Sequence, residues 1–207
     1  MKENIENIKY FRGNILESFS AYCGWKTLSL AKSNKELGNE LANFYVDIQN
    51  IHPRFFVISE RSMLISFIML MSQVLDGRRD VFSLRKINSK KTNDFIGHNK
   101  VIIDKLKKVR DEVFAHKSKK EINALVPPMN EIDDYFEKVF KFYNELSSEV
   151  EGSSTIFDDG KLITEDIENA MHNIHRGETA RRVGIDIKWK AEKNPKKLSK
   201  VEIIPKP

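Results

Sequence analysis

Apolar side chains recur every three or four positions through most of residues 1–150, and the strict alternation of a strand is scarce there. This spacing places the apolar side chains on one face of a helix. The first series is Ile5, Ile8, Phe11, Ile15 and Phe19, and the second is Leu37, Leu41, Phe44 and Ile48. They predict a helix that ends near Gly24 and a second helix that stops before Pro53.

A third helix is predicted from about Arg54 to Leu75, and it is apolar on more than one face. A helix of that kind is typical of the centre of a bundle. Ser59, Glu60 and Arg61 interrupt its apolar run, so the uncharged part is too short to cross a bilayer as one helix. We therefore expect a buried core helix and no membrane span.

Two further long helices are predicted after a short helical piece at residues 83–87. Asp94 is a candidate cap of the first, which should end near His116, and the second begins after Pro127 and Pro128. The inward stripe of the first is Ile102, Leu106, Val109 and Val113, and that of the second is Ile132, Phe136, Val139, Phe140 and Tyr143. The sequence thus predicts an all-α helical bundle.

The composition changes after Gly152, where Ser, Gly and Asp become frequent. We therefore place a domain boundary between residues 1–152 and residues 153–207. A short helix is predicted from about Thr164 to His175, and the remainder is predicted to be a partly extended tail with an edge strand or arm at Val183, Ile185, Ile187 and Trp189. No internal repeat or heptad array is evident.

The formal charge of the 207-residue chain is +5. Residues 176–207 hold ten Lys or Arg and four Asp or Glu, a net of +6, so the remaining residues net about −1. The basic tail is therefore the part that we expect to attract polyanions.

Cysteine and motif content narrow the class of protein. The single Cys23 cannot form a disulfide within the chain, and the charged N-terminus lacks the apolar stretch of a signal peptide, so a cytoplasmic location is predicted. P-loop, G-x-G-x-x-G and G-x-S-x-G motifs are absent, which excludes several large enzyme classes. His172 and His175 have the spacing of two metal ligands but lack further ligands, so we expect no metal and no cofactor.

The segment RDEVFAH, from Arg110 to His116, lies at the C-terminal end of a predicted helix. Cleavage of RNA by its own 2′-hydroxyl requires a base for that proton, an acid for the departing 5′-oxygen, and positive charge near the phosphorus oxygens. A histidine can act as base or acid, and an arginine can hold two phosphate oxygens. The segment thus contains groups suited to RNA cleavage without a metal.

The segment resembles the motif of the HEPN superfamily, whose ribonuclease members have an arginine, four to six residues and then a histidine, with Asn, Asp or His after the arginine. Here Asp111 follows Arg110, and five residues separate Arg110 from His116. With the preceding segment LMSQVLDGRRDVFSLRKI, the chain is similar to the AbiU-type abortive-infection branch over roughly residues 30–145.

The resemblance implies a HEPN-like bundle that acts as a metal-independent endoribonuclease in toxin–antitoxin or phage-defence systems. RNA is then the substrate, and a cognate antitoxin protein is a candidate partner. Arg110 would stabilise the charged phosphorane, His116 would be the general base or acid, and Asp111 would orient them.

The spacing of Arg110 and His116 favours a dimer. On an ideal helix a step of six residues turns about 600°, which leaves the two positions roughly 120° apart with about 9 Å of rise. Two such helices side by side across a two-fold axis bring the groups to one cleft more easily than one helix does. HEPN ribonucleases are similar in using a dimer-interface cleft, so we expect a homodimer with both motifs nearby.

Other interpretations of these residues stay open. His116 also suits a packed core histidine, and a positive side chain in a last helical turn is favoured by the helix dipole. Asp111 could contact only water, and Asp76 suits a turn as well as an active site. The alternative function is a non-catalytic HEPN-like module that binds nucleic acid or a partner protein.

The basic tail contains five candidate contacts to RNA or to a partner chain, namely Arg181, Arg182, Lys188, Trp189 and Lys190. The cations suit phosphate groups, and the indole suits stacking on a base. The alternative is a solvated arm with no binding role.

Overall fold

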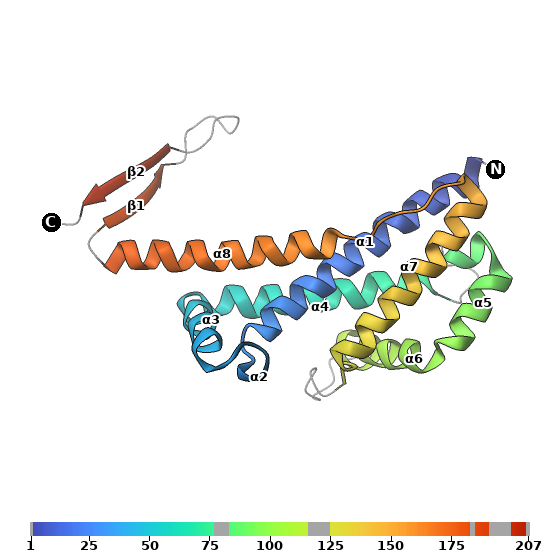
Figure 1. Ribbon diagram of the computed structural model, residues 1–207, viewed down its shortest axis with the longest axis horizontal. Coiled ribbons are helices and arrows are strands. Elements are labelled where there is room, and N and C mark those ends of the chain that lie inside the picture. The colour runs from blue at the N-terminus through green and yellow to red at the C-terminus, as the bar shows by residue number, and fades with distance from the viewer. Residues whose placement is uncertain (1, 77–82, 116–124, 183–184, 191–199, 206–207) are drawn as a thin grey trace.

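The computed structural model describes residues 2–76, 83–115, 125–182, 185–190 and 200–205. Its elements, in chain order, are α1 (Lys2–Leu30), α2 (Asn34–Leu37), α3 (Asn39–Ile51), α4 (Pro53–Val74), the 3-10 turn η1 (Leu84–Lys86), α5 (Ser89–His98), α6 (Lys100–Val109), the π-helical turn η2 (Arg110–Ala115), α7 (Met129–Glu151), α8 (Asp159–Arg182), β1 (Ile185–Lys190) and β2 (Lys200–Pro205). The described part of residues 1–150 is helical and holds no strand, which confirms the all-α prediction (Figure 1).

The main core lies between α1, α4 and α7, which cross one another in Figure 1. Tyr22 of α1 is at its centre, with ring centroids 5.3 Å from both Phe67 of α4 and Phe136 of α7. Aromatic rings bury large areas and favour such tilted and stacked pairs, so this cluster holds the three helices together. The predicted stripe of α7 is confirmed, with four of its members buried and Phe140 half-buried.

The first helix does not end near Gly24, as the sequence predicted, but continues to Leu30. The glycine instead marks a close approach between helices. A Cβ at Gly24 would lie 2.7 Å from the sulfur of Met63 in α4 and 3.2 Å from Cδ1 of Ile167 in α8. Close packing against α4 and α8 therefore explains why a residue of low helix propensity occupies this position within α1.

The third helix has nearly its predicted bounds, but it is not the buried core helix that the sequence suggested. Leu64, Phe67 and Met71 are buried on the side that packs against the bundle, whereas Phe55, Ile58 and Met69 are at least 48% exposed. By length and composition α4 could cross a membrane, and 28% of its apolar window is buried. One such helix is weak evidence for a membrane span. The chain is compatible with a soluble protein.

The long helix that Asp94 was predicted to cap is two helices. Asn88 caps α5, because its side-chain oxygen accepts a hydrogen bond of 3.1 Å from the backbone N–H of Lys91. The chain then breaks at Asn99, whose φ of −109° and ψ of 19° are not helical, before α6 begins. The short helical piece at residues 83–87 is confirmed as η1.

α7 ends at Gly152, where the sequence placed its domain boundary, and Gly152 has the left-handed φ of 69° that suits a C-cap. The following helix is longer than predicted, since α8 extends from Asp159 to Arg182. Its first half packs against α1, and Met171 joins a second apolar cluster whose other buried members are Leu28, Ala31, Tyr45, Ile48 and Phe56. α8 therefore shares core contacts with residues on both α1 and α3.

The predicted extended segment forms a two-stranded antiparallel hairpin at the end of α8 (Figure 1). Its register pairs Ile187 with Ile203 and Trp189 with Val201. The partner of the predicted edge strand is therefore the segment Lys200–Pro205, which was not predicted as a strand.

Candidate active site

The RDEVFAH segment follows α6, whose buried side chains are Ile103, Leu106 and Val109. These anchor the helix on the bundle, in contact with α4. The predicted stripe is confirmed at Leu106 and Val109, while Ile102 is half-buried and the side chain of Val113 is not described. The buried positions thus place the start of the motif at the edge of the core.

Arg110–Ala115 form a π-helical turn directly after α6. A π-helix has i→i+5 hydrogen bonds, is rare, and frequently occurs at functional sites. The turn contacts α4. The backbone of the motif is therefore held against the bundle in an unusual local geometry that the sequence pattern did not predict.

Arg110 and Asp111 form an ion pair, in which Nε of Arg110 donates to Oδ1 of Asp111 at 2.7 Å. The side chain of Arg110 is 26% exposed and that of Asp111 is 53% exposed. An ion pair at such exposure adds little to stability. Its chief effect is to hold the guanidinium group in one orientation, with its edge against a carboxylate.

His116 lies outside the described residues, so the structure does not place it relative to Arg110. Asp76 is buried at the exit of α4, the helix that η2 contacts. The structure therefore brings together Arg110 and Asp111 and leaves the position of the histidine to experiment.

A small hollow lies between the C-terminal end of α4 and α6, the helix that precedes the motif. It is lined by Met71, Ser72, Leu75, Ile103, Leu106, Lys107 and Tyr135. Lys107 precedes Arg110 by three positions, which places both on neighbouring parts of the helix surface. Lys107 was not a candidate from the sequence, although its helical spacing from Arg110 could have identified it.

A hollow of about 940 Å³ lies between α3 and the C-terminal half of α8, and no motif residue lines it. Its lining includes Arg181 and Arg182. Both arginines pair with Glu178, at 2.6 and 3.2 Å, and these contacts hold the pKa of Glu178 at about 2. The positive charge of these two tail candidates is therefore partly compensated by their own helix.

The other tail candidates lie on β1, and only their backbone register is described. Lys188 is opposite Glu202, Trp189 is opposite Val201, and Lys190 is opposite Lys200.

The two histidines of α8 lie beside an aromatic ring. The ring of Phe44 is 5.6 Å from that of His172 and 4.9 Å from that of His175, between centroids. Among the residues that the structure describes, no group of three or more His, Cys, Asp or Glu could hold a metal ion.

The all-α bundle and the Arg-x5-His spacing after α6 are both consistent with a HEPN-like helical protein. Residues 89–173 match the family model HEPN_AbiU2, described as AbiU2. The resemblance to the AbiU-type branch is thereby confirmed over that segment, which covers less than half of the chain. Neither the curated proteins nor the solved structures provide a match.

The matched segment differs from the one that the sequence analysis chose. It includes RDEVFAH and extends from α5 into α8, past Gly152, whereas the stretch LMSQVLDGRRDVFSLRKI precedes it. The motif and its helix are thus the part of the resemblance that the comparison supports.

Proposed function

We propose that the protein is a metal-independent endoribonuclease of the HEPN type that acts in the cytoplasm as a toxin or phage-defence effector. The observation behind the proposal is the ion pair of Arg110 and Asp111 on a π-helical turn, inside the segment that matches AbiU2. RNA is the proposed substrate, and a homodimer is the proposed active form. A cognate antitoxin protein is a proposed partner.

Arg110 would stabilise charge in this reaction. A guanidinium group has five N–H donors, and the contact with Asp111 uses the one on Nε. The terminal amino groups are the donors that suit two oxygens of one phosphate. Asp111 would therefore act as a positioning residue that fixes the direction of the guanidinium group.

His116 would take the proton from the 2′-hydroxyl or deliver one to the departing 5′-oxygen. The attack of the 2′-oxygen on phosphorus breaks the bond to the 5′-oxygen and leaves a cyclic phosphate. No metal takes part in this scheme. The two ribonuclease motifs of a dimer would supply the base and the acid from one cleft.

Single-turnover cleavage of a labelled RNA in EDTA tests the proposal. Arg110→Ala and His116→Ala should each lower the rate about 10²–10³-fold, the usual effect of removing one charge-stabilising group or one general base. Lys108→Ala is the control, because it removes an exposed positive charge two positions before Arg110, about 200° away around the helix. Its rate should stay close to that of the parent.

Thermal melts of the same variants separate chemistry from folding. If His116→Ala cleaves RNA as fast as the parent, the catalytic role is refuted, and a melt at much lower temperature identifies His116 as a core residue. A parent protein that binds RNA without cleaving it in any condition supports the alternative, a non-catalytic binding module.

We further propose that the basic tail binds RNA phosphates or a partner chain. Because Arg181 and Arg182 belong to α8, a truncation should begin after Arg182 to keep that helix intact. Removal of residues 183–207 should weaken RNA binding and flatten its dependence on salt, since fewer counterions are then released. The single-turnover rate at saturating protein should not change.

A further inference from the structure

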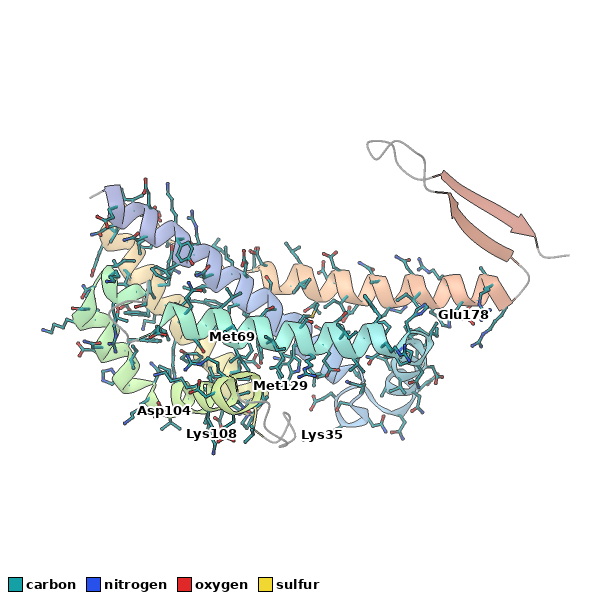
Figure 2. All side chains as sticks on the ribbon, turned by 180° about the vertical axis from the view of Figure 1, so that it is seen from behind. Lys35, Met69, Asp104, Lys108, Met129 and Glu178 are labelled. Carbon is teal, nitrogen blue, oxygen red and sulfur yellow. The ribbon has the colours of Figure 1, made fainter. Side chains whose placement is uncertain are left out.

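The outer face of α4 holds a row of exposed apolar and small side chains. Phe55 is 60% exposed, Ile58 is 64% exposed and Met69 is 48% exposed, and Ser62 between them is also exposed. Figure 2 shows α4 from this side, with Met69 on its outer surface. No described element covers this face.

The row has the spacing of a coiled-coil seam. Its members alternate steps of three and four positions and span about 26 Å along the helix. We call them the α4 seam, and they are Phe55, Ile58, Ser62, Ile65, Met69 and Ser72, of which Ile65 and Ser72 are half-buried. The pattern is hidden in the sequence because the opposite face of α4 is apolar as well.

The apolar area of the seam is sufficient for a modest interface. With about 175–200 Å² for a whole side chain of this size, the exposed parts of Phe55, Ile58 and Met69 amount to about 300 Å². A specific interface buries at least about 500 Å² per partner, slightly more than half of it apolar. The seam supplies about the apolar share of the smallest such interface, so we expect weak, concentration-dependent association.

The charges beside the seam suit a second copy of the chain. In a parallel pair of α4 helices, Arg54 and Arg61 flank the seam and face Ser59 and Ser66 of the second copy, so that no like charges are opposed. Residues 62–75 contain no Lys or Arg. A helix that lies on a lipid surface usually has a cationic border, which this part of α4 lacks.

We propose that two copies of the chain associate through the α4 seam, with their α4 helices parallel about a two-fold axis. The parallel orientation rests on the proposed function. Ser72, at the C-terminal end of the seam, lines the hollow beside Lys107, and η2 contacts α4. Parallel pairing places both motif segments at the same end of the dimer, whereas antiparallel pairing would separate them.

Light scattering coupled to gel filtration tests the seam. Ile58→Glu should reduce the mass from that of a dimer to that of a monomer. Val57→Glu is the matched control, because Val57 is 63% exposed but lies about 100° away around the helix. Thermal melts should show both variants folded.

Cysteine cross-linking tests the orientation, in a Cys23→Ala background. Met69→Cys should form a disulfide-linked dimer on mild oxidation, because parallel pairing brings this position close to its own symmetry mate. Val101→Cys, which is 73% exposed on α6, should stay monomeric under the same conditions.

Several results would overturn the proposal: a monomeric parent at tens of micromolar, a dimer that survives Ile58→Glu, or cross-linking of Phe55→Cys with Met69→Cys only. Binding of a monomeric parent to phosphatidylcholine vesicles, lost in Ile58→Glu, would assign the seam to a lipid surface instead. A dimer with the expected cross-link that cleaves no RNA would support the seam and refute the proposed function.

Discussion

At Gly160 α8 lies close against α1, and replacement of this residue by alanine tests how these helices pack. An added Cβ would lie 2.5 Å from Sγ of Cys23 and 2.6 Å from Cε1 of Phe19. The ring of Phe19 cannot move freely, because its centroid is 5.0 Å from that of Phe136 and 4.9 Å from that of Phe140. Relief of the clash therefore requires α8 to move away from α1.

Overpacking of this kind costs about 1–3 kcal/mol, and the gain in helix propensity over glycine offsets at most about 1 kcal/mol of it. We expect Gly160→Ala to lower the free energy of unfolding by about 1–2 kcal/mol. The control is Gly177→Ala on the same helix, where a Cβ meets nothing within 4 Å. That variant should raise stability by about 0.5–1 kcal/mol.

Urea titrations of the parent and both variants measure the difference, and a chain of this size should shift its melting temperature by about 2–4 °C per kcal/mol. The reasoning is refuted if Gly160→Ala is as stable as Gly177→Ala. In that case α8 is not packed on α1 at this point.

Three further outcomes follow from polar groups of α1 and from Asp133 of α7, which pairs with two of them. Asp133 accepts hydrogen bonds from Tyr22 at 2.8 Å and from Lys26 at 2.6 Å. Because Asp133 is 43% exposed, Asp133→Asn should lower the free energy of unfolding by only about 0.5–1 kcal/mol. Most of this loss should be absent when the urea titrations are repeated at high salt. Burial raises the pKa of Cys23 to about 11, so at pH 8 its alkylation should be about a hundredfold slower than that of an unperturbed thiol, and a rate equal to that of a free thiol would contradict its burial. Above pH 9 the thiol of the unfolded chain ionises at its ordinary pKa of 9.0, whereas the folded thiol stays protonated up to about pH 11. The contribution of Cys23 to the free energy of unfolding should therefore fall as pH rises from 9 to 11. Denaturant titrations at several pH values measure this change.

The motif residues Arg110, Asp111 and His116 were selected from the sequence, because residue type and spacing along the chain are enough to recognise a candidate site. The sequence could not show the π-helical turn that begins at Arg110. The apolar periodicity of a short segment does not distinguish an α-helix, with i→i+4 hydrogen bonds, from a π-helical turn, with i→i+5 hydrogen bonds. The choice between them depends on tertiary packing, here against α4.

Secondary structure was predicted well for two of the long helices. Periodicity identified α4 within one residue at each end and α7 from its stripe, because burial of that stripe is the reason the helix is stable. It was wrong at Gly24, where a low propensity is offset by contacts with Met63 and Ile167 that are distant in sequence. It also missed the break at Asn99, because the same apolar spacing continues across two helices.

The sequence by itself determined the helical class, the basic tail and the candidate chemistry of RDEVFAH, since these depend on residue type and local spacing. Only the tertiary structure decided which apolar face of α4 is buried and which is exposed. Phe55 and Phe56 are adjacent and chemically identical, yet one is 60% exposed and the other 5% exposed. The difference is set by which helices lie alongside, and neighbours that are far apart in the chain cannot be identified from the pattern of one helix.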